Sequence, residues 1–99
     1  MAHQVSPKAE ADLDDIWLNV ANESGSFDIA TRLIDSVTNQ FFLLGRHPYL
    51  GRARGDEFGA GARSLAIGEY VIVYCVENGD VLILRVVHGR RDLESLLND

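Results

Sequence analysis

Arginine is the residue type in this chain that could do chemistry on an anion, and it is unevenly distributed. Residues 46–99 contain seven arginines and no lysine, whereas residues 1–45 contain only Lys8 and Arg32 as bases. A guanidinium can bind a carboxylate or a phosphate through two parallel hydrogen bonds, which a lysine ammonium cannot do. The binding candidates in this half of the chain are Arg52, Arg54, Arg63, Arg85, His88, Arg90 and Arg91.

Three of these candidates fall in one stretch, VVHGRRDL at residues 86–93. An apolar run stops there at a glycine, and two arginines stand beside Asp92. The arginines could meet a phosphate, a carboxylate of the same chain or another protein. The neighbouring Asp92 favours a pair within the fold for Arg91.

Signals for catalysis are few. His88 could act as a general acid or base, but no serine or second histidine is placed to complete a triad with it. The chain has no HxxxH and no Cys/His cluster, and the loop GRARGDEFGAG lacks the GK[ST] ending of a phosphate-binding loop. The sequence therefore predicts no metal, no cofactor and no catalytic residue.

Length, charge and cysteine usage narrow the class of protein. A chain of 99 residues is expected to form one domain. The net charge of −6, from 15 acids and 9 bases, argues against general or sequence-specific binding of nucleic acid, which needs a cationic surface. The single Cys75 lies in an apolar run and is expected to be a core residue. With no signal peptide and no apolar stretch of about 20 residues, the sequence predicts a cytoplasmic protein with no membrane contact.

Two amphipathic helices are predicted, each preceded by a serine that can cap its first turn, Ser6 and Ser26. The second has a clean apolar stripe through Leu44 and is expected to close at Gly45. Three acidic residues of the first helix fall opposite its apolar stripe and are expected to face solvent: Asp12, Asp14 and Asp15.

Strands are predicted at residues 3–5, 63–67, 70–76 and 81–87, with a loop at 45–61 and a last helical turn at 92–97. Asn78-Gly79 between the last two strands is the strongest short signal for a hairpin. The order β-α-α-β-β-β predicts an α+β fold, with a helical hairpin packed on a mainly antiparallel sheet.

The last two strands, YVIVYCV and VLILRVV, are apolar on both faces. Antiparallel strands with one solvated face normally alternate apolar and polar residues. Two helices cover only one face, so a partner segment is expected on the other, where Arg85 would lie. Alternatively, the 45–61 loop and the C-terminal tail fold over it.

Four segments, in this order along the chain, carry a resemblance to a known family: SPKAEADLDDIW, HPYLGR, ARSLAIGEYVIVYCV and ILRVVHGRRDL. The chain resembles the ParE toxins of bacterial type II toxin–antitoxin modules, in the ParE/RelE superfamily, as one toxin domain over residues 1–99. The resemblance implies an inhibitor of DNA gyrase with no catalysis of its own. It also implies a cognate ParD-like antitoxin, whose disordered tail folds onto the toxin.

A second branch of the superfamily, the RelE-like proteins, consists of ribosome-dependent mRNA endoribonucleases that work through basic residues. The basic positions of that branch correspond here to Ala62, Ser64 and Val71, and its late tyrosine to Leu97. Only Arg91 retains a base, although a shift of one residue could bring in Arg63. The missing bases favour the gyrase inhibitor, with Arg90 on a protein surface. A ribonuclease with altered residues and a non-toxic binding module are the alternatives.

Overall fold

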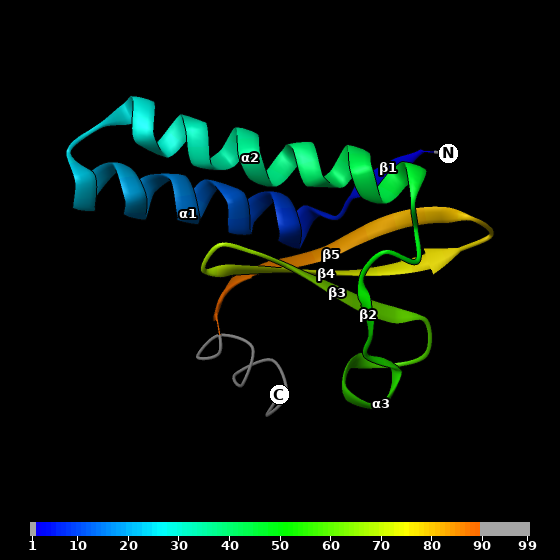
Figure 1. The fold of residues 1–99 in the computed structure, drawn as a ribbon. Helices are drawn as coiled ribbons and strands as arrows, with labels where there is room; N and C mark the ends of the chain where they lie inside the picture. The colour runs from blue at the N-terminus through cyan, green and yellow to red at the C-terminus, as the bar shows by residue number, and fades with distance from the viewer. Residues whose placement is uncertain (1, 90–99) are drawn as a thin grey trace.

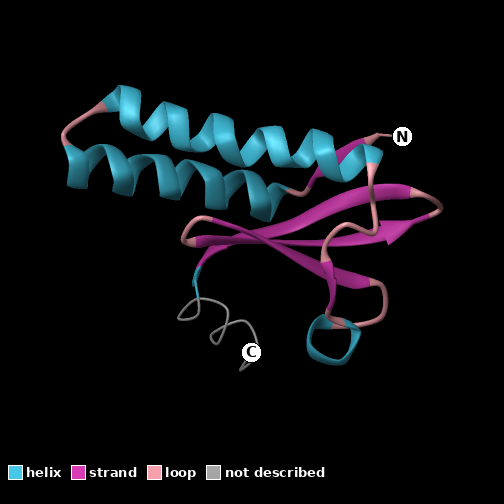
Figure 2. Ribbon diagram, in the orientation of Figure 1, coloured by secondary structure: helices cyan, strands magenta, loops and turns pink. Residues whose placement is uncertain are grey.

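The computed structural model describes residues 2–89 as two layers, a helical hairpin packed on one face of a five-stranded sheet (Figure 1). The elements are β1 (His3–Val5), α1 (Pro7–Ser24), α2 (Phe27–Arg46), β2 (Arg52–Ala53), α3 (Gly55–Phe58), β3 (Ala62–Ile67), β4 (Tyr70–Glu77) and β5 (Asp80–His88). The sheet order is β1-β5-β4-β3-β2, and of these strand pairs only β1 and β5 run parallel (Figure 2). The predicted α+β fold is confirmed.

The helices begin and end where local chemistry favours it. Ser6 and Ser26 each cap a helix, their hydroxyl oxygens accepting a hydrogen bond from the amide three residues on, at 3.1 and 3.2 Å. Gly25 ends α1 with φ 69°, in the left-handed conformation. Gly45, expected to close the second helix, is buried inside it, and α2 ends at Arg46. Within residues 2–89, neither helix is long and apolar enough to cross a membrane.

The predicted hairpin between β4 and β5 is confirmed, with φ of 54° at Asn78 and 82° at Gly79. The prediction of a single loop at residues 45–61 was wrong in part, because β2 and α3 lie within it. β2 is two residues held by pairing with β3, and α3 is one turn. Elements of this length are too short to carry a periodic signal in the sequence.

A β-bulge determines which side chains of β5 face the helices. The pairing register shifts between Val73 and Tyr74 of β4, which leaves Leu84 of β5 as an extra residue. Side chains alternate along a strand, so an odd and an even position can share a face only if a residue is inserted between them. Because of the bulge, Ile83 and Val86 both enter the core.

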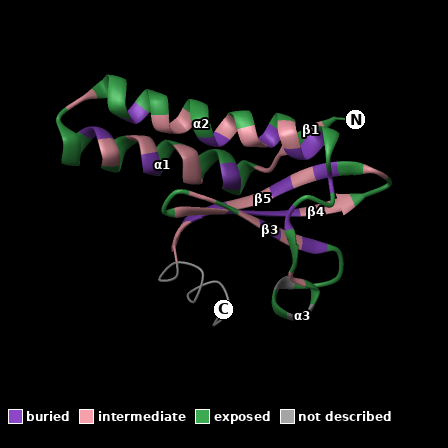
Figure 3. Cartoon of the chain, viewed as in Figure 1, coloured by how far each residue is buried: buried purple, intermediate pink, exposed green. Residues whose placement is uncertain are grey.

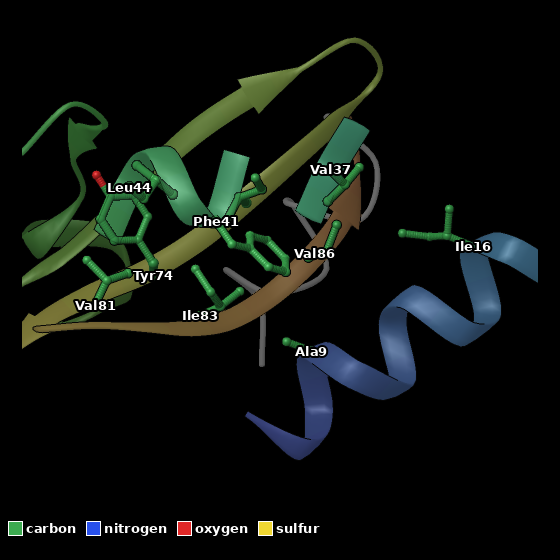
Figure 4. Close-up of a cluster of buried hydrophobic side chains, with 10 residues drawn as sticks. Ala9, Ile16, Val37, Phe41, Leu44, Tyr74, Val81, Ile83 and Val86 are labelled. Atoms are coloured by element: carbon green, nitrogen blue, oxygen red, sulfur yellow. The ribbon is translucent and has the colours of Figure 1, made fainter. Parts of the chain in front are cut away.

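The core lies between the hairpin and one face of the sheet (Figure 4). Its buried residues are Ala9, Ile16, Val37, Phe41, Leu44, Ile72, Tyr74, Val81, Ile83 and Val86. On the opposite face Val73 and Val87 are buried, while Val71, Cys75 and Leu82 are half-buried. The two strands are therefore apolar on both faces, as predicted, and exposed residues gather on the outer sides of the helices (Figure 3).

Where β1 ends, Ser6 and Asp12 continue to form hydrogen bonds with the backbone of β5. β1 pairs with β5 as far as Ile83, whose carbonyl also accepts the amide of Ser6 at 2.9 Å. The hydroxyl of Ser6 donates to the carbonyl of Leu84 at 2.9 Å. The carboxylate of Asp12, on α1, then accepts the amide of Val86 at 2.9 Å. These contacts satisfy backbone groups that a sheet edge otherwise leaves to water.

The expectation that Asp12 faces solvent was wrong. Its side chain is 14% exposed, and its carboxylate accepts two hydrogen bonds from Arg85, at 2.7 Å from Nε and 3.0 Å from Nη2. α1 packs against β5, so a residue at the border of the apolar stripe meets the strand instead of water. Asp14 and Asp15 are exposed, as expected. The register sets Arg85 opposite Val73, on the face away from the hairpin as expected, while its guanidinium is bound to Asp12 of α1.

We predict that Asp12→Ala lowers the free energy of unfolding by about 2–4 kcal/mol. The change removes a charge-assisted acceptor and leaves the Arg85 guanidinium and the Val86 amide without this partner. Urea denaturation of the purified variant measures the effect. Asp15→Ala, an exposed position on the same helix, is the matched control and should stay within about 0.5 kcal/mol of wild type. Equal stability of the two variants would contradict the role of Asp12.

Candidate functional site

The side chain of Tyr74 joins the sheet to the loop that follows α2. Tyr74 is fully buried, and its hydroxyl accepts the amide of Gly51 at 2.8 Å and donates to the carbonyl of Pro48 at 2.9 Å. A Cβ at position 51 would lie 2.5 Å from that hydroxyl, closer than real contacts allow. Glycine is therefore required there by close approach. We name residues 47–51 the Tyr49 loop.

Arg63 holds the same loop from β3. Its Nε donates to the carbonyl of Gly51 at 2.9 Å, and its Nη2 donates to the carbonyl of Tyr49 at 3.1 Å. The guanidinium also lies over the Tyr49 ring, 5.4 Å from the centroid, within the range of a cation–π contact. The backbone of the loop is thus fixed, while the side chains of Tyr49 and Leu50 point into solvent, 70% and 51% exposed.

β2 follows the Tyr49 loop directly in the chain, and its pairing with β3 sets Arg52 opposite Ser64. Arg54 donates to the Ser64 hydroxyl at 2.9 Å and to both carboxylate oxygens of Glu57 at 3.0 Å, so its charge is already compensated. Arg52 is exposed on β2 and makes no side-chain hydrogen bond or ion pair with the side chains that the structure describes, which do not include those of Asp56 and Phe58. Three of the predicted binding residues, Arg52, Arg54 and Arg63, therefore lie on or next to β2 and β3. The register sets Arg52 on the face of Ser64 and Arg63 on the opposite face with Tyr74.

The remaining candidates lie elsewhere. Arg85 is bound to Asp12 at the edge of β5. His88, at the end of β5, has its Nε2 3.5 Å from a carboxylate oxygen of Glu69 and its ring edge-on to Tyr70, with centroids 5.2 Å apart. Arg90 and Arg91 lie outside the described residues, as does the predicted helical turn at 92–97.

The positions at which RelE-like ribonucleases carry bases share the sheet face that points away from the helical hairpin. Ala62 and Ser64 are 3% and 6% exposed, and the register places them on the face of Val73 and Cys75. Val71, half-buried, lies on the same face. Ser64 uses its hydroxyl oxygen to accept from Arg54. The side chains at these three positions carry no charge, although Arg54 contacts Ser64 and the register places Arg52 and Arg85 on the same face.

The described residues offer neither an activated nucleophile nor a metal site. Burial, with a smaller effect of the nearby Glu77 carboxylate, raises the pKa of the Cys75 thiol above its usual value, so the neutral thiol is favoured near pH 7. Within residues 2–89 no group of three or more His, Cys, Asp and Glu side chains is placed to hold a metal ion.

Exposed apolar side chains are the functional signal that the sequence analysis did not identify. Among the side chains that the structure describes, six large apolar ones are at least half exposed: Leu18, Phe27, Ile29, Phe42, Tyr49 and Leu50. Phe42 contacts the edge of the His3 ring, with centroids 4.8 Å apart, beside an open pocket of about 560 Å³ that Ala2 and Arg46 also line. Phe42 lies outside the apolar stripe of α2, so a helical wheel of the sequence could have identified it. The exposure of Tyr49 could not be predicted, because it depends on the conformation of the loop.

The chain matches known toxins in sequence and in fold. The model of the family "ParE toxin of type II toxin-antitoxin system, parDE" matches residues 4–93. Toxin ParE3 of Caulobacter vibrioides is 30% identical over 86 residues, which cover 87% of this chain and 84% of that protein.

Two solved structures share the fold. A chain of the chromosomal ParDE system from P. aeruginosa aligns with TM-score 0.78 at 24% identity, over 91% of this chain and 97% of that one. A chain of the RelBE2 toxin–antitoxin complex from Mycobacterium tuberculosis aligns with TM-score 0.67 at 24% identity, over 88% and 95%.

We predict that Tyr74→Phe lowers the free energy of unfolding by about 1–3 kcal/mol, because the Gly51 amide and the Pro48 carbonyl lose a buried partner. Gly51→Ala should lower it at least as much, since its Cβ would overlap the Tyr74 hydroxyl. Gly55→Ala is the control, because its Cβ would meet nothing within 4 Å. Thermal and urea unfolding measure all three. If Gly51→Ala matches Gly55→Ala in stability, the loop is not held as described.

Proposed function

Because this chain belongs to the ParE toxin family of type II toxin–antitoxin systems, we propose that it arrests growth by inhibiting DNA gyrase. It acts in the cytoplasm by binding, without catalysis of its own and without a cofactor. A cognate ParD-like antitoxin binds the toxin and neutralises it. The family membership supports the toxin function directly, and the two finer assignments, gyrase and the antitoxin, rest on the features below.

The lack of a basic side chain at the three ribonuclease positions is the observation that carries this proposal. A ribonuclease without a metal has to stabilise the charge of the transition state with basic side chains held in place beforehand. Ala62, Ser64 and Val71 supply no charge, and two of them are buried. A protein that inhibits its target by binding needs no such cations on this face.

The ribonuclease alternative is weakened further by Arg63. A one-residue shift could have placed its guanidinium with the missing bases, but the register sets it opposite Tyr74, on the other face from Ser64. It is also bound to the backbone of the Tyr49 loop. The similarity to the RelBE2 chain, at 24% identity, concerns the fold alone.

An antitoxin partner is supported by apolar side chains that the described chain leaves partly open. Val71, Cys75 and Leu82 are half-buried on one sheet face, and Phe42 is 63% exposed on the hairpin. Disordered segments that fold on binding cover such extended surfaces. Since Arg85 already holds a carboxylate of its own chain, the exposed Arg52 is a better candidate for pairing with the antitoxin.

We assign the end of β5 and the residues after it to contact with gyrase. His88, at the last position of that strand, is half-buried beside Glu69, and Arg90 follows two residues later. We propose that Arg90 contacts gyrase, and that Arg91 pairs with Asp92 within the fold. Both assignments rest on the sequence alone.

We predict that expression of this chain without its antitoxin induces the DNA-damage response and blocks division while translation continues. Reporter induction and incorporation of labelled amino acids over the first minutes separate the two effects. With purified proteins, the toxin should inhibit supercoiling by gyrase, and addition of the antitoxin should restore it. Cuts in messenger RNA on the ribosome that precede any DNA damage would refute gyrase as the target and favour the ribonuclease alternative.

A further inference from the structure

Two valines are buried on the sheet face that points away from the helical hairpin, which we name the outer face. Val73 of β4 is 3% exposed and Val87 of β5 is 5% exposed. Beside Val87, β5 is also at the edge of the sheet, since β1 pairs with it only as far as Ile83. Side chains stand roughly perpendicular to a sheet, so a valine on an uncovered face keeps its methyl groups in contact with water. The burial of both valines therefore requires a layer of atoms over the outer face.

The described elements outside the sheet do not account for the burial of Val87. α1 and α2 pack on the opposite face (Figure 1). The Tyr49 loop is held there too, by the side chains of Tyr74 and Arg63, which the register sets on the hairpin face. On the outer side, Arg54 and α3 contact β3, which is two places from β5 in the sheet order. The layer over Val87 is therefore supplied by another segment or by another molecule.

Residues 90–99, which we name the tail, follow the buried Val87 almost directly. Gly89, with φ 45°, ends the extended conformation of β5, so the chain turns away from the strand there. The sequence of the tail, RRDLESLLND, sets Leu93, Leu96 and Leu97 at helical spacing, which gives a helix a single apolar stripe. Such a helix buries its leucines only by packing on an apolar surface, and the outer face is the nearest one along the chain.

The length of the tail matches the distance that it has to cover. Val71 pairs with Val87, and Val73 lies two residues further along β4, about 7 Å away. Ten residues in helical form extend about 15 Å, so a helix that folds back after Gly89 can cover both buried valines. Cys75, a further two residues along β4 on the same face, is half-buried. A cover that ends near Val73 accounts for this decrease in burial.

Attachment and charge favour the tail over a second copy of the chain or another protein. The tail begins three positions after Val87, so its effective concentration at the outer face is on the order of millimolar, which a separate chain in solution has to match. Residues 92–99 hold three acids and no base. The register places two arginines, Arg52 and Arg85, in the row of Val73 across the outer face. The tail therefore complements this face in charge as well as in its apolar stripe.

We propose that residues 90–99 form an amphipathic helix that covers the outer face, with Leu93, Leu96 and Leu97 packed on the two buried valines. Of the covers that the sequence leaves open for this face, a partner segment and the chain itself, the burial of Val73 and Val87 selects the chain itself. The tail then keeps RNA away from the face on which RelE-like ribonucleases carry their bases. This inference does not depend on gyrase being the target.

The test locates the tail in the purified full-length protein by NMR, with the methyl groups of leucine and valine isotopically labelled. The methyl groups of Leu96 and Leu97 should show nuclear Overhauser effects to those of Val73 and Val87. A mixture of labelled and unlabelled chains distinguishes contacts within one chain from contacts between two. Effects that arise between two chains, or tail leucines that show no effect to either valine, would overturn the proposal.

Substitutions in the tail measure what this packing contributes. Leu96→Ala and Leu97→Ala should each lower the melting temperature by about 5 °C or more, because each removes apolar contacts from the outer face. Ser95→Ala, on the opposite side of the proposed helix, is the matched control and should melt within about 1 °C of wild type. Equal melting temperatures of the leucine variants and Ser95→Ala would show that the tail does not pack there and would also overturn the proposal.

Discussion

The fold depends on how the first twelve residues are fastened to the last described strand. β1 adds to β5 in parallel, Ser6 continues the ladder through its amide and hydroxyl, and Asp12 closes it through its carboxylate. The same Ser6 hydroxyl oxygen caps α1, so one side chain both starts the helix and ties it to the sheet. The position of the helical hairpin over the sheet follows from these few polar contacts, and the apolar core fills the space they define.

The bulge at Leu84 also contributes to the packing of the helical hairpin against β5. Without an extra residue, Val86 would face away from the hairpin, and the core would lose a side chain that is now 2% exposed. The bulge also stands next to Arg85, whose guanidinium reaches Asp12 on α1. A single inserted residue thus lets Val86 enter the core while the neighbouring Arg85 forms its ion pair with Asp12.

The sequence predicts well what short-range patterns encode. Ser6 and Ser26 mark the helix starts, and Asn78-Gly79 marks the hairpin, because each acts through its neighbours. The role of Asp12 could not be predicted, since its partner lies 73 positions away and helical periodicity places it at the border of the solvent face. The binding candidates remain predictions, and the sequence did not show how the fold would distribute them. Arg52 follows the Tyr49 loop directly in the chain. Arg63 meets the loop only because the fold brings β3 beside it, and β2, which pairs with β3 there, is too short to leave a pattern.

The contacts that join β1 and α1 to β5 also determine the order in which the chain can assemble. The partners of Ser6 and Asp12 are residues 83–86, and the Ser6 hydroxyl and the Leu84 carbonyl, for example, are 78 positions apart. A nascent chain on the ribosome can form its helices early, since they are local, but it cannot dock them until β5 has been made. Docking of the helical hairpin is thus a late, long-range step of folding, which follows the formation of the helices themselves.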